Sequence, residues 1–160
     1  MLHDQAAFFS PSSPLSNMFD CDFVVDGVWY HTTEQFIVVQ KAMLFGDADI
    51  ISQVRQLRNP VQMKQRGKEI KGLNRDEWHV KAPALILPGL LAKFEQVNVC
   101  RAMLLATGDR LLVEASPHDL FWGVGIGLND VRLWNRKYHR GHNMMGKLLM
   151  TVRDEIVSQI

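Results

Sequence analysis

The segment between Thr32 and Gly46 constrains the fold most, because both ends of a helix are marked within it. Thr32 is a helix-capping residue, and Gln35 three positions later completes a capping-box pattern. Gly46 is typical of the position just after a helix, where the backbone often takes a positive φ. The segment therefore predicts one helix of about three to four turns.

Similar boundary residues divide much of the remaining chain into helices. Asn59-Pro60 supplies a cap followed by a first-turn proline, and Thr107-Gly108 closes a later helix. Pro83 and Pro88 should shorten or kink the longest segment. We predict further helices over about 47–57, 61–70, 78–96, 97–106 and 143–158.

Few segments have the pattern of a strand. Asp26-Gly27 stands between two apolar triplets and predicts a hairpin with a type I′ turn, since that turn needs positive φ at both central residues. Residues 6–9 form a short apolar run, 111–113 indicate a buried strand, and 120–138 are predicted to be an irregular loop. The fold class is therefore α+β, a single compact domain over residues 1–160, mainly helical with a small β-sheet or hairpin.

The composition excludes several classes of function. The chain has 18 Lys and Arg against 17 Asp and Glu, which argues against a protein that grips duplex DNA mainly through phosphates. Nucleic acid remains possible as the carrier of a substrate. Cys21 and Cys100 have no CxxC or Cys-His spacing, which argues against a metal site.

Neither a signal peptide nor a membrane span is predicted. The opening MLHDQAAFFS has no basic region followed by an apolar one. The most apolar stretch, 82–94, is too short to span a bilayer and contains two prolines. We therefore expect a cytoplasmic protein with no membrane partner.

Glu34 and Lys41 are the first candidate site residues. They are seven positions apart, about two helical turns, so both lie on nearly one face roughly 10 Å apart along the axis. This spacing suits two groups that flank a substrate. Taken alone, it is explained better by a first-turn glutamate at the helix dipole and a solvated lysine.

Three further segments offer polar groups. Asp119 and Trp122 could pair a carboxylate with a stacking surface, although a turn and a packed tryptophan explain them too. The helix start at Asn143 could bind an anion through free N–H groups, and plain N-capping explains it equally well. Ser16 and Asn17 offer polar side chains beside an aromatic residue, and a turn explains them too.

The order of five blocks is more specific than any of these signals. FFSPSSPLSNMF, VWYHTTEQFIVVQKA, LLAKFEQ, LLATGDRLLVEASPHDLFWGVGIG and GHNMMGKLLMTVRDEI resemble the NADAR family, also described as YbiA-like, over nearly the whole chain. The resemblance implies an N-glycosidase, a hydrolase that breaks the C1′–N bond of a phosphorylated ribose. Family members remove ADP-ribose from guanine bases, or cleave ribosylamine intermediates of riboflavin synthesis.

The resemblance also implies roles for individual residues. Three match catalytic positions: Glu34, Lys41 and Asp119. Six match substrate-binding positions: Ser16, Asn17, Trp122, Gly123, Asn143 and Gly146. The chain departs from the family pattern at Met18, which separates Asn17 from the next phenylalanine, and at the two prolines of 82–91.

Several alternatives stay open at this point. Glu34 and Asp119 could each stabilise the oxocarbenium-like sugar or serve the leaving base. Lys41 could position a phosphate or the leaving group, or attack C1′ as a neutral amine. This chemistry requires no metal or other cofactor. ADP-ribosylated guanine, as a nucleoside or in nucleic acid, is the preferred substrate. A phosphorylated ribosylaminopyrimidine is the alternative, and a non-catalytic ADP-ribose-binding or nucleotide-binding module is the competing class. The sequence does not predict the oligomeric state.

Overall fold

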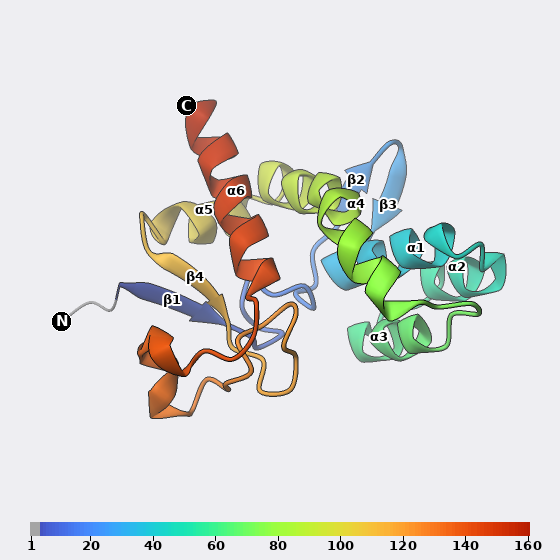
Figure 1. The fold of residues 1–160 in the computed structure, drawn as a ribbon. Helices are drawn as coiled ribbons and strands as arrows, with labels where there is room; N and C mark the ends of the chain where they lie inside the picture. Colours follow the sequence, from blue (N-terminus) through green and yellow to red (C-terminus); the bar gives the residue numbers. More distant parts are fainter. Residues whose placement is uncertain (1–3) are drawn as a thin grey trace. The chain divides into compact units, whose positions relative to one another are not determined.

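The computed structural model describes residues 4–160 of the chain (Figure 1). Residues 1–3, part of the predicted domain and of the opening segment tested for a signal peptide, lie outside the described residues. The chain divides into two units, Asn17–Val97 and a second made of the residues up to Ser16 together with Asn98–Ile160. The predicted α+β class is confirmed, because residues 4–160 contain six α-helices and two small two-stranded sheets.

The unit formed by the two ends of the chain is built on a parallel strand pair. Strand β1 (Gln5–Phe8) pairs with β4 (Leu111–Glu114), so that Gln5 lies opposite Leu111. Helices α5 (Asn98–Ala106) and α6 (Met144–Ser158) belong to the same unit, and α6 packs against β4. This pairing was not predicted, because neither short apolar run identifies its partner.

A small hydrophobic cluster supports the region after β4. It consists of Val113, Ala115, Val124, Ile126 and Leu133. The segment predicted as an irregular loop contains two short 3-10 helices, η1 (Val131–Trp134) and η2 (Arg136–Tyr138). Leu133 is fully buried, so it anchors the first of these turns in the core.

The unit of residues 17–97 begins with the predicted hairpin. Strands β2 (Phe23–Val25) and β3 (Val28–Tyr30) pair in antiparallel fashion. Asp26 and Gly27 have φ of 49° and 78°, both positive as a type I′ turn requires.

Four helices complete this unit. They are α1 (Thr33–Leu44), α2 (Ala48–Arg55), α3 (Pro60–Lys68) and α4 (Arg75–Gln96). The predicted caps are confirmed, since the side chains of Thr32 and Asn59 accept hydrogen bonds from backbone N–H groups of α1 and α3. Gly46 has a φ of 72°, as expected for the residue after a helix.

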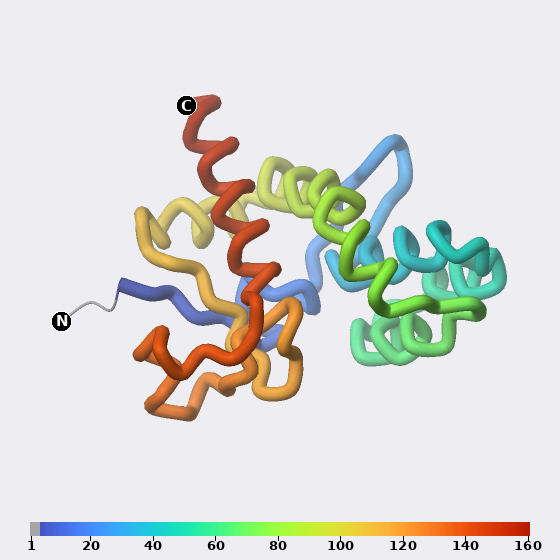
Figure 2. The backbone as a smooth tube through the Cα atoms, viewed as in Figure 1, coloured from blue at the N-terminus to red at the C-terminus, as the bar shows by residue number. Residues whose placement is uncertain are grey.

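Of the two effects expected of the prolines in helix α4, bending occurs and shortening does not. It runs unbroken for 22 residues through Pro83 and Pro88 (Figure 2), and its axis bends along the way. Each internal proline costs about 3 kcal/mol. The buried face offsets this cost, because Trp78, Ala82 and Ile86 follow the helical repeat and neither proline is on that face.

No helix within residues 4–160 is both long and apolar enough to cross a membrane.

Candidate active site

Glu34 is held in the first turn of α1 by the segment that precedes the hairpin. Its backbone N–H donates to the backbone oxygen of Asn17 at 2.9 Å, and its side chain is half-buried. The side-chain Oδ1 of Asn17 is buried and has no hydrogen-bond partner in the described structure. Buried amide oxygens are nearly always paired, so an unpaired one next to the start of α1 is unusual.

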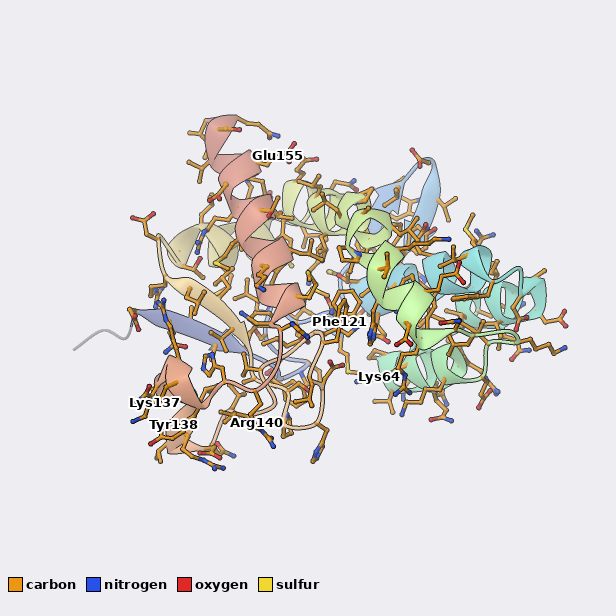
Figure 3. All side chains as sticks on the ribbon, viewed as in Figure 1. Lys64, Phe121, Lys137, Tyr138, Arg140 and Glu155 are labelled. Atoms are coloured by element: carbon orange, nitrogen blue, oxygen red, sulfur yellow. The ribbon has the colours of Figure 1, made fainter. Side chains whose placement is uncertain are left out.

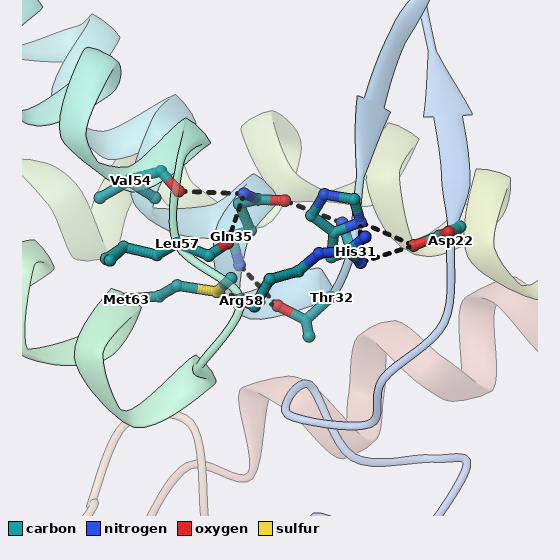
Figure 4. A network of polar contacts seen from close by, with 8 residues as sticks. All are labelled: Asp22, His31, Thr32, Gln35, Val54, Leu57, Arg58 and Met63. Carbon is teal, nitrogen blue, oxygen red and sulfur yellow. Dashed lines mark hydrogen bonds and ion pairs between the residues drawn. The ribbon is translucent and has the colours of Figure 1, made fainter.

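The start of α1 is fixed from several sides (Figure 4). Thr32 Oγ1 accepts from the N–H of Gln35 at 3.0 Å, which is the predicted cap. The Gln35 side chain accepts from the N–H of His31 at 2.8 Å and donates to Val54 O at 3.0 Å. These bonds tie the helix start to α2, so the carboxylate of the first turn is carried on a rigid support.

Lys41 lies in the last turn of the same helix and is half-buried. Burial lowers the pKa of Lys41, the charge of Glu34 opposes that shift, and Arg75 and Lys68 lower the pKa further. Its Nζ lies 5.8 Å from the centre of the Trp78 ring. The amine is therefore neutral over a wider pH range than an exposed lysine, as a nucleophilic amine requires.

Lys93 on α4 is a residue that the sequence analysis did not single out. It is fully buried, and its Nζ lies 4.9 Å from the ring centre of Phe94 and 5.9 Å from that of Phe19. Fully buried lysines are rare. The signal was its position in the apolar helical repeat that includes Ile86 and Gly89. Phe19 belongs to the segment bonded to α1, which places Lys93 close to that segment.

Asp119 organises the loop that follows β4. Its Oδ1 accepts from the N–H of Phe121 at 2.9 Å and from that of Trp122 at 2.7 Å. The Phe121 and Trp122 rings then meet edge to face, with centroids 4.7 Å apart. Asp119 thus has an architectural task, whatever its part in the chemistry.

Position 123 requires a glycine because its backbone lies very close to neighbouring atoms at the end of β4. A Cβ at this position would lie 2.8 Å from the Cβ of Ser116 and 2.9 Å from the backbone oxygen of Glu114. Any side chain would push the loop away from the end of β4. The predicted Trp122-Gly123 pair thereby lies next to the end of β4.

The structure brings this loop together with the start of α6. The N–H groups of His142, Asn143 and Met145 donate to Leu120 O, Gly123 O and Trp122 O at 2.8, 3.1 and 3.1 Å. The two glycine-containing motifs of this unit, far apart in sequence, therefore lie side by side. The N–H groups of Met144 and Met145 are occupied by the loop, which leaves fewer first-turn donors for an anion than we expected.

Asn143 does not cap α6 through its side chain, so the N-capping interpretation is wrong. Its backbone is in the left-handed region, with φ of 53° and ψ of 41°, and its side chain is directed toward β4. Its Oδ1 accepts from Glu114 N–H at 3.0 Å, and its Nδ2 donates to Leu112 O at 2.8 Å. A Cβ on Gly146 would overlap Leu112 O and this amide, so both residues seat α6 on the strand.

The remaining candidate of this unit, Ser16, is buried, and its Oγ donates to Phe9 O at 3.5 Å. The predicted residues thus fall into two sets, one in each unit. Asn17, Glu34 and Lys41 belong to residues 17–97. The other unit carries Ser16, Asp119, Trp122, Gly123, Asn143 and Gly146. Within residues 4–160, no three His, Cys, Asp or Glu side chains gather as a metal site would require.

The model of the NADAR domain matches residues 4–157, and the chain therefore belongs to the NADAR domain family. The match runs through both units. It confirms the resemblance found in the sequence.

Several relatives have been named. The chain is 32% identical to N-glycosidase R617 of Acanthamoeba polyphaga mimivirus over 79% of its own length and 74% of the relative's. It is 30% identical to N-glycosidase YbiA of Escherichia coli (strain K12), covering 93% and 86% of the two chains. It is 35% identical to Protein irg-1 of Caenorhabditis elegans over 78% of its length, but spans only 59% of that protein.

A solved structure is similar throughout. The NMR structure of the Escherichia coli protein YbiA matches with a TM-score of 0.78 and 28% sequence identity, over 99% of this chain and 89% of that one. The fold of the family is therefore the fold of this chain.

Proposed function

We propose that this protein is an N-glycosidase that hydrolyses the C1′–N bond of a phosphorylated ribose, with ADP-ribosylated guanine as its substrate. The names of the mimiviral and bacterial relatives support the reaction class. The observation that carries the proposal is the pairing of Glu34 with a lysine of lowered pKa on one helix. A pure binding module needs neither group.

The residues suit the charge that develops during this reaction. Breaking the C1′–N bond leaves positive charge on the sugar, which a nearby carboxylate stabilises. The departing nitrogen leaves more readily once it is protonated. Glu34 and Asp119 are the two carboxyl groups that we propose for these two roles. Trp122 offers an aromatic face for the base or the ribose.

The lowered pKa of Lys41 favours its attack on the sugar over a purely electrostatic role. A bond from Nζ to C1′ forms as the C1′–N bond of the substrate breaks, and the departing nitrogen takes a proton. The sugar ring then opens to an imine with Lys41. Water hydrolyses the imine, which releases the sugar and restores the amine.

A second substrate class has one observation in its favour. The chain is 29% identical to the Riboflavin biosynthesis protein PYRR, chloroplastic, of Zea mays over 82% of its length. It spans only 19% of that protein. This relationship favours a phosphorylated ribosylaminopyrimidine as the alternative substrate.

A paired assay tests the proposal. The protein is incubated separately with an ADP-ribosylated guanine oligonucleotide and with the phosphorylated ribosylaminopyrimidine, and released base and sugar are separated by chromatography. We expect free ADP-ribose from the first substrate and faster turnover of it. Faster turnover of the second substrate would assign the alternative. Tight binding of ADP-ribose with no release from either substrate would show a binding module.

A further inference from the structure

A short basic and aromatic segment lies outside the residues used so far. Residues 131–140 read VRLWNRKYHR, with four Arg or Lys and no Asp or Glu. The entire chain has a formal net charge of only +1, so its other residues are acidic overall. The even balance of the composition therefore conceals one concentrated basic segment.

The structure presents these side chains to solvent on a fixed support. Leu133 is buried in the core, and its backbone oxygen lies 2.8 Å from His139 Nε2. Trp134 and Tyr138 are 38% and 44% exposed although both are large aromatic residues. The two 3-10 turns are capped by Asp130 and Asn135. The segment is thus a rigid platform with exposed rings.

The four basic side chains differ in their existing partners. Arg132 is paired with Asp130 at 2.6 Å, and this pairing holds the pKa of Asp130 down at about 2. Arg136 pairs with Asp4 at 2.9 Å, where both side chains are well exposed. Exposed pairs of that kind are weak and easily exchanged for another anion. Arg136 is therefore available for exchange, and Arg132 is the least available.

The remaining two cations lie next to the aromatic rings or to the loop of the candidate site. Lys137 Nζ lies 4.9 Å from the ring centre of Tyr138, and Figure 3 shows these side chains and Arg140 extending from the segment. Arg140 donates from its guanidinium to Gly125 O and from its backbone N–H to Val124 O. The basic segment thus continues directly into residues 142–145, whose backbone N–H groups donate to the loop that carries Trp122.

We propose that residues 131–140 bind a single strand of nucleic acid and lead it toward that loop. Alternating cations and exposed rings are what single-strand binding uses, since cations contact phosphates and rings stack on bases. Arg136, Lys137 and Arg140 hold the backbone, while Trp134 and Tyr138 stack on bases. The inference deepens the proposed function, on which it rests, by naming the carrier of the modified guanine.

Binding is tested without any catalysis. Fluorescence anisotropy with a labelled, unmodified single-stranded oligonucleotide measures affinity at several salt concentrations. We expect the double variant Arg136→Ala with Lys137→Ala to bind at least about tenfold more weakly, with a salt slope reduced by about 1.4, as for two lost phosphate contacts. Lys64→Ala with Lys81→Ala removes the same charge from exposed lysines of the other unit and should bind like wild type.

The aromatic contribution has its own comparison. Tyr138→Ala should weaken binding about tenfold, whereas Tyr138→Phe keeps a stacking ring and should retain most of the affinity. If the first double variant binds as tightly as the lysine control, or if wild type prefers anionic lipid vesicles to the oligonucleotide, the inference is overturned.

Turnover separates this inference from the proposed function. The Arg136 and Lys137 double variant should raise KM for a modified oligonucleotide at least about tenfold and leave cleavage of ADP-ribosylguanosine unchanged. Equal effects on both substrates overturn the strand-binding role. If wild type cleaves neither the oligonucleotide nor the nucleoside, the proposed function is overturned. The anisotropy measurements then still decide whether residues 131–140 bind a single strand.

Discussion

The backbone N–H of Glu34 donates to the backbone oxygen of Asn17 at 2.9 Å. This bond joins two residues of the predicted site across the whole hairpin. It also satisfies one of the N–H groups that a helix start leaves without an internal partner. The acidic first turn of α1 and the unpartnered amide oxygen of Asn17 are therefore held as one piece of structure.

The residues of α1 should dominate turnover. Glu34→Gln and Lys41→Ala are each expected to lower kcat by at least about 100-fold, because each removes a charge or nucleophile from the reacting centre. Circular dichroism should show the fold retained. Met43→Ala on the same helix, at an exposed position, is the matched control. Wild-type rates in both site variants would remove these residues from the mechanism.

Lys41 should be trapped on the sugar. Borohydride added during turnover should reduce an imine to a stable adduct, which mass spectrometry would locate on the peptide containing Lys41. Because the neutral amine attacks, kcat should rise with pH through the lowered pKa of Lys41. A rate that falls over that range, with no adduct, would instead assign Lys41 an electrostatic role.

The half-buried amine of Lys41 should lower the stability of the folded protein. Its pKa is lower in the folded chain than in the unfolded one, so unfolding takes up protons, and stability rises with pH toward the ordinary lysine range. Lys41→Met keeps the apolar stem and should raise Tm at neutral pH while it abolishes turnover. Thermal melts at pH 7 and pH 10 should differ less for this variant than for wild type. A lower Tm for the variant would contradict the expected cost of burying the amine.

Asp119 allows architecture and chemistry to be separated. Asp119→Asn keeps an oxygen that can accept from the N–H groups of Phe121 and Trp122, whereas Asp119→Ala removes it. We expect Asp119→Asn to retain the wild-type Tm and lose at least about 100-fold in kcat. Asp119→Ala should lose stability as well, by about 1–3 kcal/mol. Full activity in Asp119→Asn would leave the residue with its architectural role alone.

Asn143 should be critical for stability. Asn143→Ala leaves Glu114 N–H and Leu112 O without their side-chain partner and adds left-handed strain, for a loss of about 3 kcal/mol. Asn143→Gly loses the same bonds without the strain and should be about 1 kcal/mol less harmful. Urea unfolding measures both, with the exposed His142→Ala as control. Equal losses for the Ala and Gly variants would show that the left-handed backbone costs nothing.

Local features of the fold were predictable, and pairings across the chain were not. The caps at Thr32 and Asn59 and the turn at Asp26 depend on adjacent residues, so the sequence reveals them. The pairing of β1 with β4 depends on residues about a hundred positions apart. The continuity of α4 depends on packing that outweighs the local effect of Pro83 and Pro88.

The candidate site shows the same division. Resemblance identified Glu34, Lys41 and Asp119, but no local signal showed that the Asn143 side chain bonds to β4, because that contact is made in three dimensions. Lys93 was missed since a lysine in a helix is ordinarily read as a solvent-facing residue. Its place in the apolar repeat of α4 was the one sequence signal, and its burial shows what that signal meant.

The parallel pair of β1 and β4 has a consequence for synthesis of the chain. Strand β1 emerges from the ribosome about a hundred residues before the strand that pairs with it. Residues 17–97 form one continuous unit, and all of it is synthesised before β4. During translation this unit can fold first. Until β4 is made, the edge of β1 is unpaired, and it is then the part of the nascent chain most exposed to aggregation.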